Sequence, residues 1–508
     1  MKKNILKLAL FALLAVPALQ SCELDQFPAG SIPNEESFQT LEDLAKFDRG
    51  TMADIRGISR VGWQVSDVQA DYFQPNLSYG NRLGMVYRWE FTDNEDDIVS
   101  AYTGPYGALV DFNNFLNNYQ KALPEEGTAE YDAALEEVSQ YVANAYFGRA
   151  LAYYSLVTRF AKDFEPATAA EDLGVVITTE VDLNYRAPRA SVERTYEFIS
   201  EQLELALQFC RETEPSVDYI AEPVIKFLQA RVALDTHNYG DAVTIAKDVI
   251  ENYGFELAQS QDDFANVWLL DEGNEIVFEP AATQDEPMSW GLWLTFSNNK
   301  YQPDWIPSQA TLDLYDFATD YRAWYWFRDT GFSGPGNNSE VTTNGSEDFD
   351  SILLFGKYQG NTNIMLNSDD VLHTYKNVPK TFRLAELYLI AAEAAYQNGD
   401  ETTAQQYIAD LQTSRGLTPV FGGSGSLFNV IKLEWKKEFI GEGQRLICLK
   451  RWHEGFTRDA RAQVDNLIET ANSSRGIGAT INANDQRFVW DIPLNDKTHG
   501  GIPGNWSL

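Results

Sequence analysis

An internal repeat of two helix hairpins constrains the fold of this chain more than any other feature of its sequence. When Ala242 is aligned with Ala404, the residues around them fall into register. The further matched pairs are Ala230 with Ala392, Ala233 with Ala395, and Gly254 with Gly416. Small alanines let antiparallel helices approach closely, and a closing glycine accepts the left-handed conformation that ends a helix. Each copy therefore predicts two antiparallel helices joined by a short polar turn.

This arrangement is the tetratricopeptide pattern, in which helix hairpins stack and share one core. A third hairpin can be built from residues 141–160 and 191–210, with an insertion in its turn. Alanine-rich hairpins also occur in plain helix bundles, which remain the alternative.

Hydrophobic periodicity extends the helical prediction to most of the chain. Apolar residues recur every three or four positions over residues 142–160 and 384–395, as on one face of a helix. Further helices are expected at residues 40–55, 105–121, 193–211, 223–236, 241–252, 402–415 and 427–440. Short extended segments at 274–280 and 487–493 indicate minor strands. The predicted fold is mainly α, with tetratricopeptide-like helix hairpins, long loops and a few short strands.

The N-terminus has the features of a lipoprotein signal peptide. Three lysines precede residues 8–19, which carry no charge and are too short to span a bilayer. The residues that follow, Leu19 to Cys22, resemble a lipobox, in which the chain is cut before the cysteine. We therefore expect residues 1–21 to be removed and Cys22 to carry the lipid anchor of an otherwise soluble protein. A plain signal peptide with a chance cysteine is the alternative.

Charge and cysteine content exclude several functions. The chain has 39 Lys+Arg against 75 Asp+Glu, and a surface of that sign repels nucleic acid and anionic lipid headgroups. Besides Cys22, only Cys210 and Cys448 are present. They lie too far apart in sequence to suggest a disulfide framework or a metal site, and we expect two buried thiols.

Catalytic and cofactor motifs are absent from the sequence. It contains no Walker A loop, no His-Glu-x-x-His and no Gly-x-Ser-x-Gly. The segment 93–97 resembles the start of a calcium loop, but Ile98 stands where such a loop needs glycine and Gly104 where it needs glutamate. No cofactor is expected, and calcium is a minor alternative.

Aromatic residues gather in two stretches that are candidates for ligand binding. Five of the 12 tryptophans fall within residues 290–326: Trp290, Trp293, Trp305, Trp324 and Trp326. Alternation along 323–327 would place Trp324 and Trp326 on one side of an extended segment. The second stretch, 71–97, contributes the candidates Asp71, Tyr72 and Trp89. Exposed aromatic faces flanked by polar groups suit the apolar faces and hydroxyls of sugars, whereas buried ones belong to the core.

Several segments resemble the SusD/RagB family of lipoproteins. They include "SCELDQFPAGSI" (21–32), "AYFGRALAYYSLVTRF" (145–160), "FRLAELYLIAAEAAYQNGD" (382–400) and "LEWKKEFIGEGQRLICLKRW" (433–452). The resemblance covers nearly the whole mature chain in the family's order. The chain departs from the pattern at residues 161–163, where Ala-Lys-Asp replaces Gly-Asp, and at its end, which lacks Asn-Pro-Gly-Tyr.

The resemblance implies a function that composition does not give. Family members are outer-membrane surface lipoproteins that cap a SusC-like TonB-dependent transporter and deliver a glycan to it without turning it over. It also implies an N-terminal region at 22–262 and a C-terminal region at 263–508 within one compact unit, with the ligand held by loops and short strands. A peptide ligand with the same partner is the first alternative, and a secreted glycoside hydrolase the second.

Overall fold

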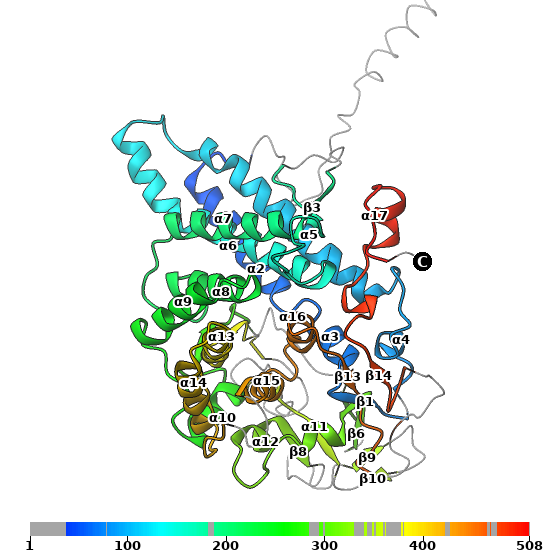
Figure 1. Cartoon of the computed structure of the whole chain (residues 1–508). Helices are drawn as coiled ribbons and strands as arrows, with labels where there is room; N and C mark the ends of the chain where they lie inside the picture. The colour runs from blue at the N-terminus through cyan, green and yellow to red at the C-terminus, as the bar shows by residue number, and fades with distance from the viewer. Residues whose placement is uncertain are drawn as a thin grey trace, which may run out of the picture.

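The computed structural model describes residues 37–506 apart from several gaps. The gaps are residues 78, 181–186, 284–293, 298–299, 330–339, 343–347, 350–351, 359–360, 362–376, 379, 422–426, 465–467 and 469–474. Cys22 and the predicted signal peptide, 1–21, lie outside the described residues, as do Trp290 and Trp293. Within the described part, the predicted mainly α fold is confirmed (Figure 1).

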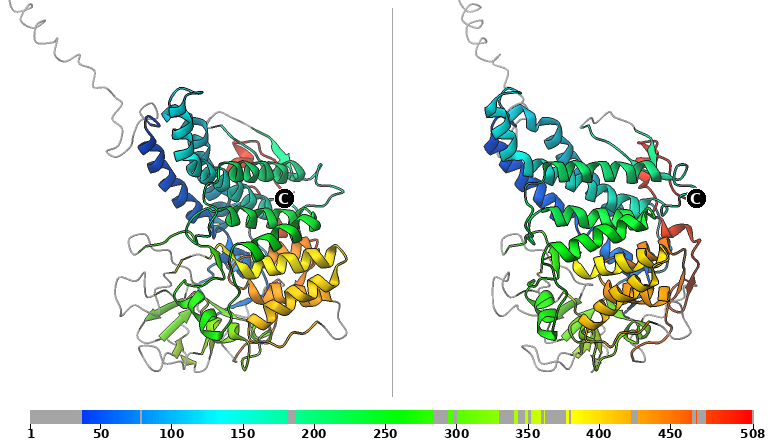
Figure 2. Two further views of the ribbon diagram at one scale, coloured as in Figure 1. Left: turned by 90° about the vertical axis from the view of Figure 1, so that its left-hand side faces the viewer. Right: turned by 60° about the vertical axis from the view of Figure 1, so that its left-hand side comes forward.

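Stacked helix hairpins form the scaffold. The main helices are α2 (Leu41–Ile58), α5 (Asp96–Asn118), α6 (Ala129–Phe160), α7 (Val192–Phe209), α8 (Glu222–Asp235), α9 (Tyr239–Asn252), α10 (Gln261–Leu269), α13 (Leu384–Gln397), α14 (Glu401–Ser414), α15 (Leu427–Glu438) and α16 (Arg445–Arg451). Helix α6 packs against α7, α8 against α9, and α13 against both α9 and α14. Figure 2 shows these pairs lying one below another, so the predicted tetratricopeptide-like stack, including the third hairpin, is confirmed.

The repeat residues act as the alignment predicted. Ala230 and Ala392 are fully buried where the helices meet. Gly254 (φ 72°) and Gly416 (φ 79°) both adopt the left-handed conformation after their hairpins. At Gly416 a side chain is also excluded by space, because a Cβ there would lie 2.6 Å from the carbonyl oxygen of Thr319. This close approach ties the end of α14 to the segment that precedes α12 (Tyr321–Trp326).

Two secondary-structure predictions need correction. Helix α5 begins at Asp96 rather than at residue 105, and Pro105 lies inside it. The segment 487–493 forms no strand: Gln486–Phe488 is a turn of 3-10 helix. The main-chain N–H of Trp490 donates to the carbonyl of Arg159 at 2.9 Å, so this segment docks on the end of α6 instead of joining a sheet.

Short strand pairs lie among the loops, most of them in the C-terminal half. The antiparallel pairs are β1 (Phe73–Pro75) with β7 (Trp305–Pro307), β2 (Leu173–Val176) with β3 (Arg189–Ser191), β4 (Ile276–Phe278) with β12 (Phe382–Arg383), β8 (Phe327–Asp329) with β11 (Leu353–Phe355), and β13 (Phe456–Thr457) with β14 (Thr480–Ile481). A four-stranded sheet has the order β10 (Asp348–Phe349), β9 (Glu340–Thr342), β6 (Lys300–Pro303), β5 (Leu294–Ser297). Strand β4 confirms the strand predicted at 274–280.

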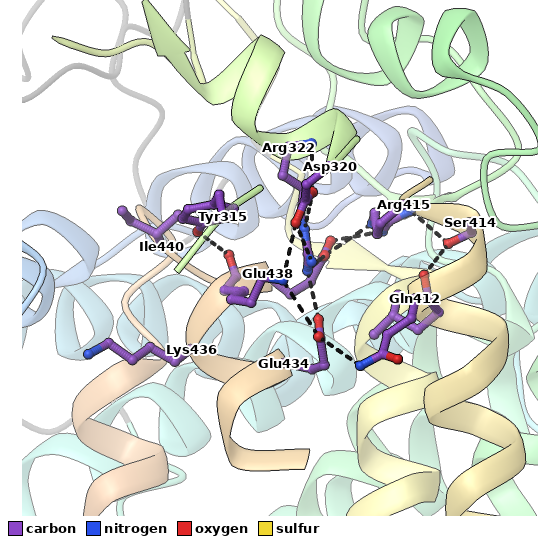
Figure 3. A network of polar contacts seen from close by, with 12 residues as sticks. Tyr315, Asp320, Arg322, Gln412, Ser414, Arg415, Glu434, Lys436, Glu438 and Ile440 are labelled. Carbon is purple, nitrogen blue, oxygen red and sulfur yellow. Dashed lines mark hydrogen bonds and ion pairs between the residues drawn. The ribbon is translucent and has the colours of Figure 1, made fainter. Parts of the chain in front are cut away.

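A buried network of charges joins the helical scaffold to the strand-bearing half (Figure 3). Arg322, on α12, lies 2.9 Å from both Asp320 and Glu434 and 3.1 Å from Glu438. Arg415, at the end of α14, lies 2.8 Å from the same Glu438. These side chains are almost fully buried, and each charge has opposite charges as neighbours, which is the condition for keeping ions out of water. The network fixes α12 on α14 and α15.

Cys448 is buried on α16, and Cys210 is partly buried after α7. Burial raises the pKa of the Cys448 thiol to about 12 and that of Cys210 to about 11, so both stay protonated near neutral pH. None of the helices in the described ranges is long and apolar enough to cross a membrane.

Candidate functional site

The structure brings the two predicted ligand-binding stretches together. Strand β1 of the first stretch pairs with β7 of the second, placing Pro75 opposite Trp305. The rings of Tyr79 and Tyr87 pack on Trp305, with centroids 5.5 Å and 5.1 Å away. The two stretches therefore form one layer, with this aromatic cluster inside it.

Burial removes five of the predicted site residues from the ligand surface. Asp71, Tyr72, Trp89, Trp305 and Trp326 are at most 7% exposed and belong to the core. Trp89 donates its Nε1 hydrogen to the carbonyl of Gln69 at 2.8 Å. The hydroxyl of Tyr72 likewise donates to the carbonyl of Lys436. These side chains are therefore not exposed in this structure, and their predicted contact with a ligand stays a prediction.

Asp71 has a structural role. Its carboxylate lies 2.9 Å from Arg445 and 2.7 Å from Lys436. Burial alone would raise the pKa of this carboxyl, but the two cations hold it well below its usual range. Asp71 therefore stays ionised and fastens the segment before β1 to α15 and α16.

Among the predicted site residues that the structure describes, Trp324 has the exposed side chain, at 47%. The sequence alternation failed here because residues 321–326 form helix α12, not an extended segment. In a helix, residues two positions apart point about 200° apart, so Trp326 faces the core while Trp324 faces out. Beneath Trp326, the ammonium of Lys357 lies 3.7 Å from the ring centroid.

The exposed indole of Trp324 is held in place. Its Nε1 donates to the carbonyl oxygen of Phe317 at 2.7 Å. Phe317 is itself 39% exposed, and its ring packs on Phe327 with centroids 6.2 Å apart. Phe327 contacts Phe355 in turn, which packs on Phe73 of β1. This aromatic series connects the Trp324 platform, meaning Trp324 and Phe317, to the layer around Trp305.

A second exposed surface lies on the other stretch. We call it the Arg88 surface; it consists of the exposed residues Leu77, Asn81, Arg82, Met85 and Glu90 around the partly buried Arg88. Its backbone is strained, since Asn81 (φ 58°), Leu83 (φ 53°) and Trp89 (φ 56°) all adopt the left-handed conformation. Non-glycine residues rarely take this conformation, and such strain gathers at functional sites.

Arg88 is fixed at several points within this surface. Its Nη1 donates to Tyr79 Oη at 3.1 Å and to Asn81 Oδ1 at 3.0 Å. Its Nε donates to Glu90 Oε2 at 2.9 Å, and Nη2 contacts the sulfur of Met85 at 3.3 Å. These contacts hold a planar guanidinium beside the exposed side chain of Met85. The result is a rigid surface with both apolar and hydrogen-bonding groups.

Asp304 borders the Arg88 surface. Its carboxylate lies 2.6 Å from Arg82. Burial raises the pKa of Asp304 to about 6, against the opposing effect of Arg82. Sequence reasoning had not selected Asn81, Arg82, Met85, Glu90 or Asp304. The available signal was the "YGNRLG" turn at 79–84, whose glycines and asparagine favour left-handed backbone.

The calcium-like segment has other partners. Asp93 lies 2.6 Å from Lys497. Asp96 and Asp97 form the first turn of α5, where acidic side chains favour the helix dipole. These contacts supply a structural role for the segment, and calcium binding there stays a prediction.

Two family models match successive parts of the chain. The model described as the SusD family matches residues 277–497, and the one described as "starch-binding associating with outer membrane" matches residues 34–223. The chain belongs to the SusD/RagB family. No curated protein matches it.

Solved structures share the fold over nearly its whole length. A SusD superfamily protein from Bacteroides thetaiotaomicron is 24% identical, with a TM-score of 0.74 over 92% of this chain and 100% of the other. Surface glycan-binding protein A from Bacteroides fluxus is 20% identical, with a TM-score of 0.62 over 91% and 99%. A laminarin-binding SusD-like protein is 17% identical, with a TM-score of 0.64 over 91% and 99%. At these identities the likeness establishes the fold alone.

Proposed function

We propose that this protein is a cell-surface lipoprotein that binds an oligo- or polysaccharide and delivers it to a SusC-like TonB-dependent outer-membrane transporter. The observation that carries the proposal is the exposed indole of Trp324. The indole N–H of Trp324 donates to the Phe317 carbonyl. The apolar faces of the exposed indole are therefore the part that a ligand can contact. Sugar rings present C–H faces of matching size, and a fixed indole loses little conformational freedom on binding them.

The Arg88 surface supplies the complementary polar groups. Asn81 and Arg88 are held in fixed orientations that suit hydroxyl groups, and the exposed side chains of Met85 and Leu77 offer apolar contact nearby in the chain. The names of similar proteins support a carbohydrate ligand, since they describe starch-binding, glycan-binding and laminarin-binding members. We infer that the Trp324 platform and the Arg88 surface are the candidate ligand surfaces.

The proposed role is binding without catalysis. Glu90 and Asp304, the carboxylates of the Arg88 surface and its border, are each paired with an arginine at 2.9 Å and 2.6 Å. An arginine partner favours the ionised form of each carboxylate, whereas a general acid must be protonated; for Asp304 burial opposes this effect, so the release of reducing ends is the deciding measurement. Anchoring through Cys22 and docking on the transporter complete the proposal, and they rest on the lipobox and on the family resemblance.

A binding test can separate this proposal from its alternatives. Purified protein is titrated with soluble glycans, including starch and laminarin oligosaccharides, and with peptides, while the release of reducing ends is followed. Trp324→Ala should weaken glycan binding by about 1–3 kcal/mol and barely change the melting temperature. Leu494→Ala is the matched control, because Leu494 is 40% exposed on α17 (Leu494–Thr498), at the opposite end of the molecule in Figure 1.

Three results would overturn the proposal. Binding of peptides but no glycan would favour the peptide branch. Product release that follows the pure protein would make it a hydrolase. Equal affinities of wild type and Trp324→Ala for a bound glycan would place the site elsewhere.

A further inference from the structure

Three side chains that are common metal ligands meet near the end of helix α6. They are Asp163 and Glu165, in the loop after α6, and His453, just after α16. One ligand atom from each lies within 4.8 Å of the others. His453 Nε2 is 2.8 Å from Glu165 Oε1 and 3.6 Å from Asp163 Oδ2. The site is built from elements other than those of the Trp324 platform and the Arg88 surface.

Both chain segments that carry these ligands are fixed. His453 has a left-handed backbone (φ 51°), and its N–H donates to the carbonyl of Lys450 at 3.0 Å. The buried ammonium of Lys450 donates to the carbonyls of Thr158 and Ala161, at 2.8 Å and 2.7 Å. Lys450 therefore ties the end of α16 to the end of α6 and holds His453 opposite the acidic loop.

The acidic loop is equally constrained. The carbonyl of Glu165 accepts hydrogen bonds from the main-chain N–H groups of Thr168 and Ala169, at 2.9 Å and 2.8 Å. A site whose ligands are held before the ion arrives binds it without first ordering the chain.

One ligand atom lacks the partner that its burial demands. Asp163 Oδ2 is itself shielded from solvent, although the Asp163 side chain as a whole is 23% exposed, and this oxygen has no hydrogen-bond partner among the described residues; His453 Nε2 lies 3.6 Å from it. Buried carboxylate oxygens are nearly always paired, so this oxygen marks a position where a further group belongs. A cavity of about 20 Å³, lined by Asp163, Tyr196 and Lys450 among others, adjoins it and has room for one water molecule.

Two of the three separations are near those of a tetrahedral ion. Zn–N and Zn–O bonds of about 2.0–2.1 Å at tetrahedral angles place ligand atoms roughly 3.3 Å apart. The distances of 2.8 Å and 3.6 Å from His453 Nε2 lie on either side of that value. Small side-chain rotations would therefore suffice to admit the ion. Two carboxylates also balance its double charge, and one imidazole favours a first-row transition metal over calcium.

We propose that Asp163, Glu165 and His453 bind a Zn²⁺ ion, with water as the fourth ligand. The ion links the loop after α6 to the end of α16. It joins residues 288 positions apart in the sequence, on the side of the molecule where the helix hairpins stack.

Zn²⁺ and Co²⁺ titrations of the purified protein test this site. Wild type should bind one Zn²⁺, and Co²⁺ in its place should give the visible absorption of a four-coordinate ion. His453→Ala and Asp163→Asn should each weaken Zn²⁺ binding by more than about tenfold and abolish that absorption. His499→Ala is the matched control, because His499 is also exposed and lies on α17's end, away from the acidic loop.

Glu165→Gln provides a milder variant. The Glu165 side chain is 37% exposed, so removing its negative charge should disturb the fold little. Its Zn²⁺ affinity should fall while its circular dichroism stays that of the wild type. Absence of Zn²⁺ binding by folded wild-type protein, or unchanged affinity in both His453→Ala and Glu165→Gln, would overturn the proposal.

Discussion

The guanidinium of Arg322 lies 2.9 Å from the carboxylate of Glu434, and both side chains are almost completely buried. Arg322 belongs to α12, two residues before the exposed Trp324, whereas Glu434 belongs to α15 of the scaffold. This pair therefore connects the proposed ligand platform to the stacked helices. The position of Trp324 therefore depends on a buried ion network around Arg322, Glu434 and Glu438 (Figure 3).

Arg322→Met should destabilise the protein strongly. It leaves Asp320, Glu434 and Glu438 buried near one another with fewer compensating cations, and breaking a buried pair typically costs about 3–5 kcal/mol. Urea denaturation measures the loss. Arg461→Met is the control, because Arg461 pairs with Asp313 but is 60% exposed, and its loss should change stability little. Equal effects of the two substitutions would contradict the structural role of the network.

The scaffold was predictable because its signals are local. Helix periodicity, the packing alanines and the terminal glycines Gly254 and Gly416 are properties of neighbouring residues in the sequence. These signals do not depend on contacts with residues far away in the sequence. The same local signals gave the wrong start for α5. Proline is typical of the first turn of a helix, but Pro105 lies within α5, which begins at Asp96.

The site was less predictable because exposure depends on distant partners. Trp324 and Trp326 lie in one aromatic run, yet Trp326 is buried against Lys357 and Trp268 while Trp324 is exposed. Asp71 lies in an aromatic and polar stretch typical of sugar-binding sites. Its ion-pair partner Arg445, however, lies more than 370 positions away in the sequence. Only the tertiary structure decides which aromatic and acidic residues remain for a ligand.

Asp67 should make stability depend on pH. Burial raises the pKa of its carboxyl to about 8, against weaker opposing effects that include a 3.1 Å hydrogen bond from the N–H of Gly443. The unfolded carboxyl ionises near pH 4, so between about pH 4 and pH 8 the folded state binds more protons than the unfolded state. The contribution of Asp67 is therefore fully present below pH 4 and is lost as the pH rises through 8.

Asp67→Asn removes this dependence, since the amide stays neutral and still accepts from Gly443. The variant should gain stability relative to wild type as the pH rises from 4 to 8, by at most about 1.4 kcal/mol per pH unit. Chemical denaturation at several pH values measures the difference. A constant difference across this range would show that Asp67 is ionised in the folded protein.

Cys22→Ala tests the predicted anchor. The substitution removes the thiol that would be acylated, and the mature chain has no other feature that we expect to hold it on a membrane. The variant should move from the outer-membrane fraction to the soluble fraction, as followed by immunoblotting. Ser21→Ala is the control, because it keeps a small residue directly before the cysteine, where the predicted lipobox is cut. A Cys22→Ala protein that still sediments with membranes in high salt would contradict the lipoprotein prediction.

Gly84→Ala tests the Arg88 surface without removing any of its polar groups. Gly84 begins α4 (Gly84–Tyr87), and a Cβ there would lie 2.9 Å from Arg88 Nη1 and closer still to Asn81. The methyl group must therefore displace the two side chains that we propose contact the glycan. Asn81 is exposed and can move outward, whereas moving Arg88, whose side chain is 16% exposed, breaks its hydrogen bonds to Tyr79 and Asn81, so a small loss of stability should accompany the change. Glycan affinity should fall by about 1–2 kcal/mol, the scale of one or two lost hydrogen bonds, as measured by calorimetry.

Gly107→Ala, on α5, is the control, since its Cβ meets no atom within 4 Å. That change should leave affinity unchanged and stabilise the helix slightly. If Gly84→Ala binds the glycan as wild type does, Arg88 and Asn81 take no part in recognition, and the ligand is held by the Trp324 platform alone.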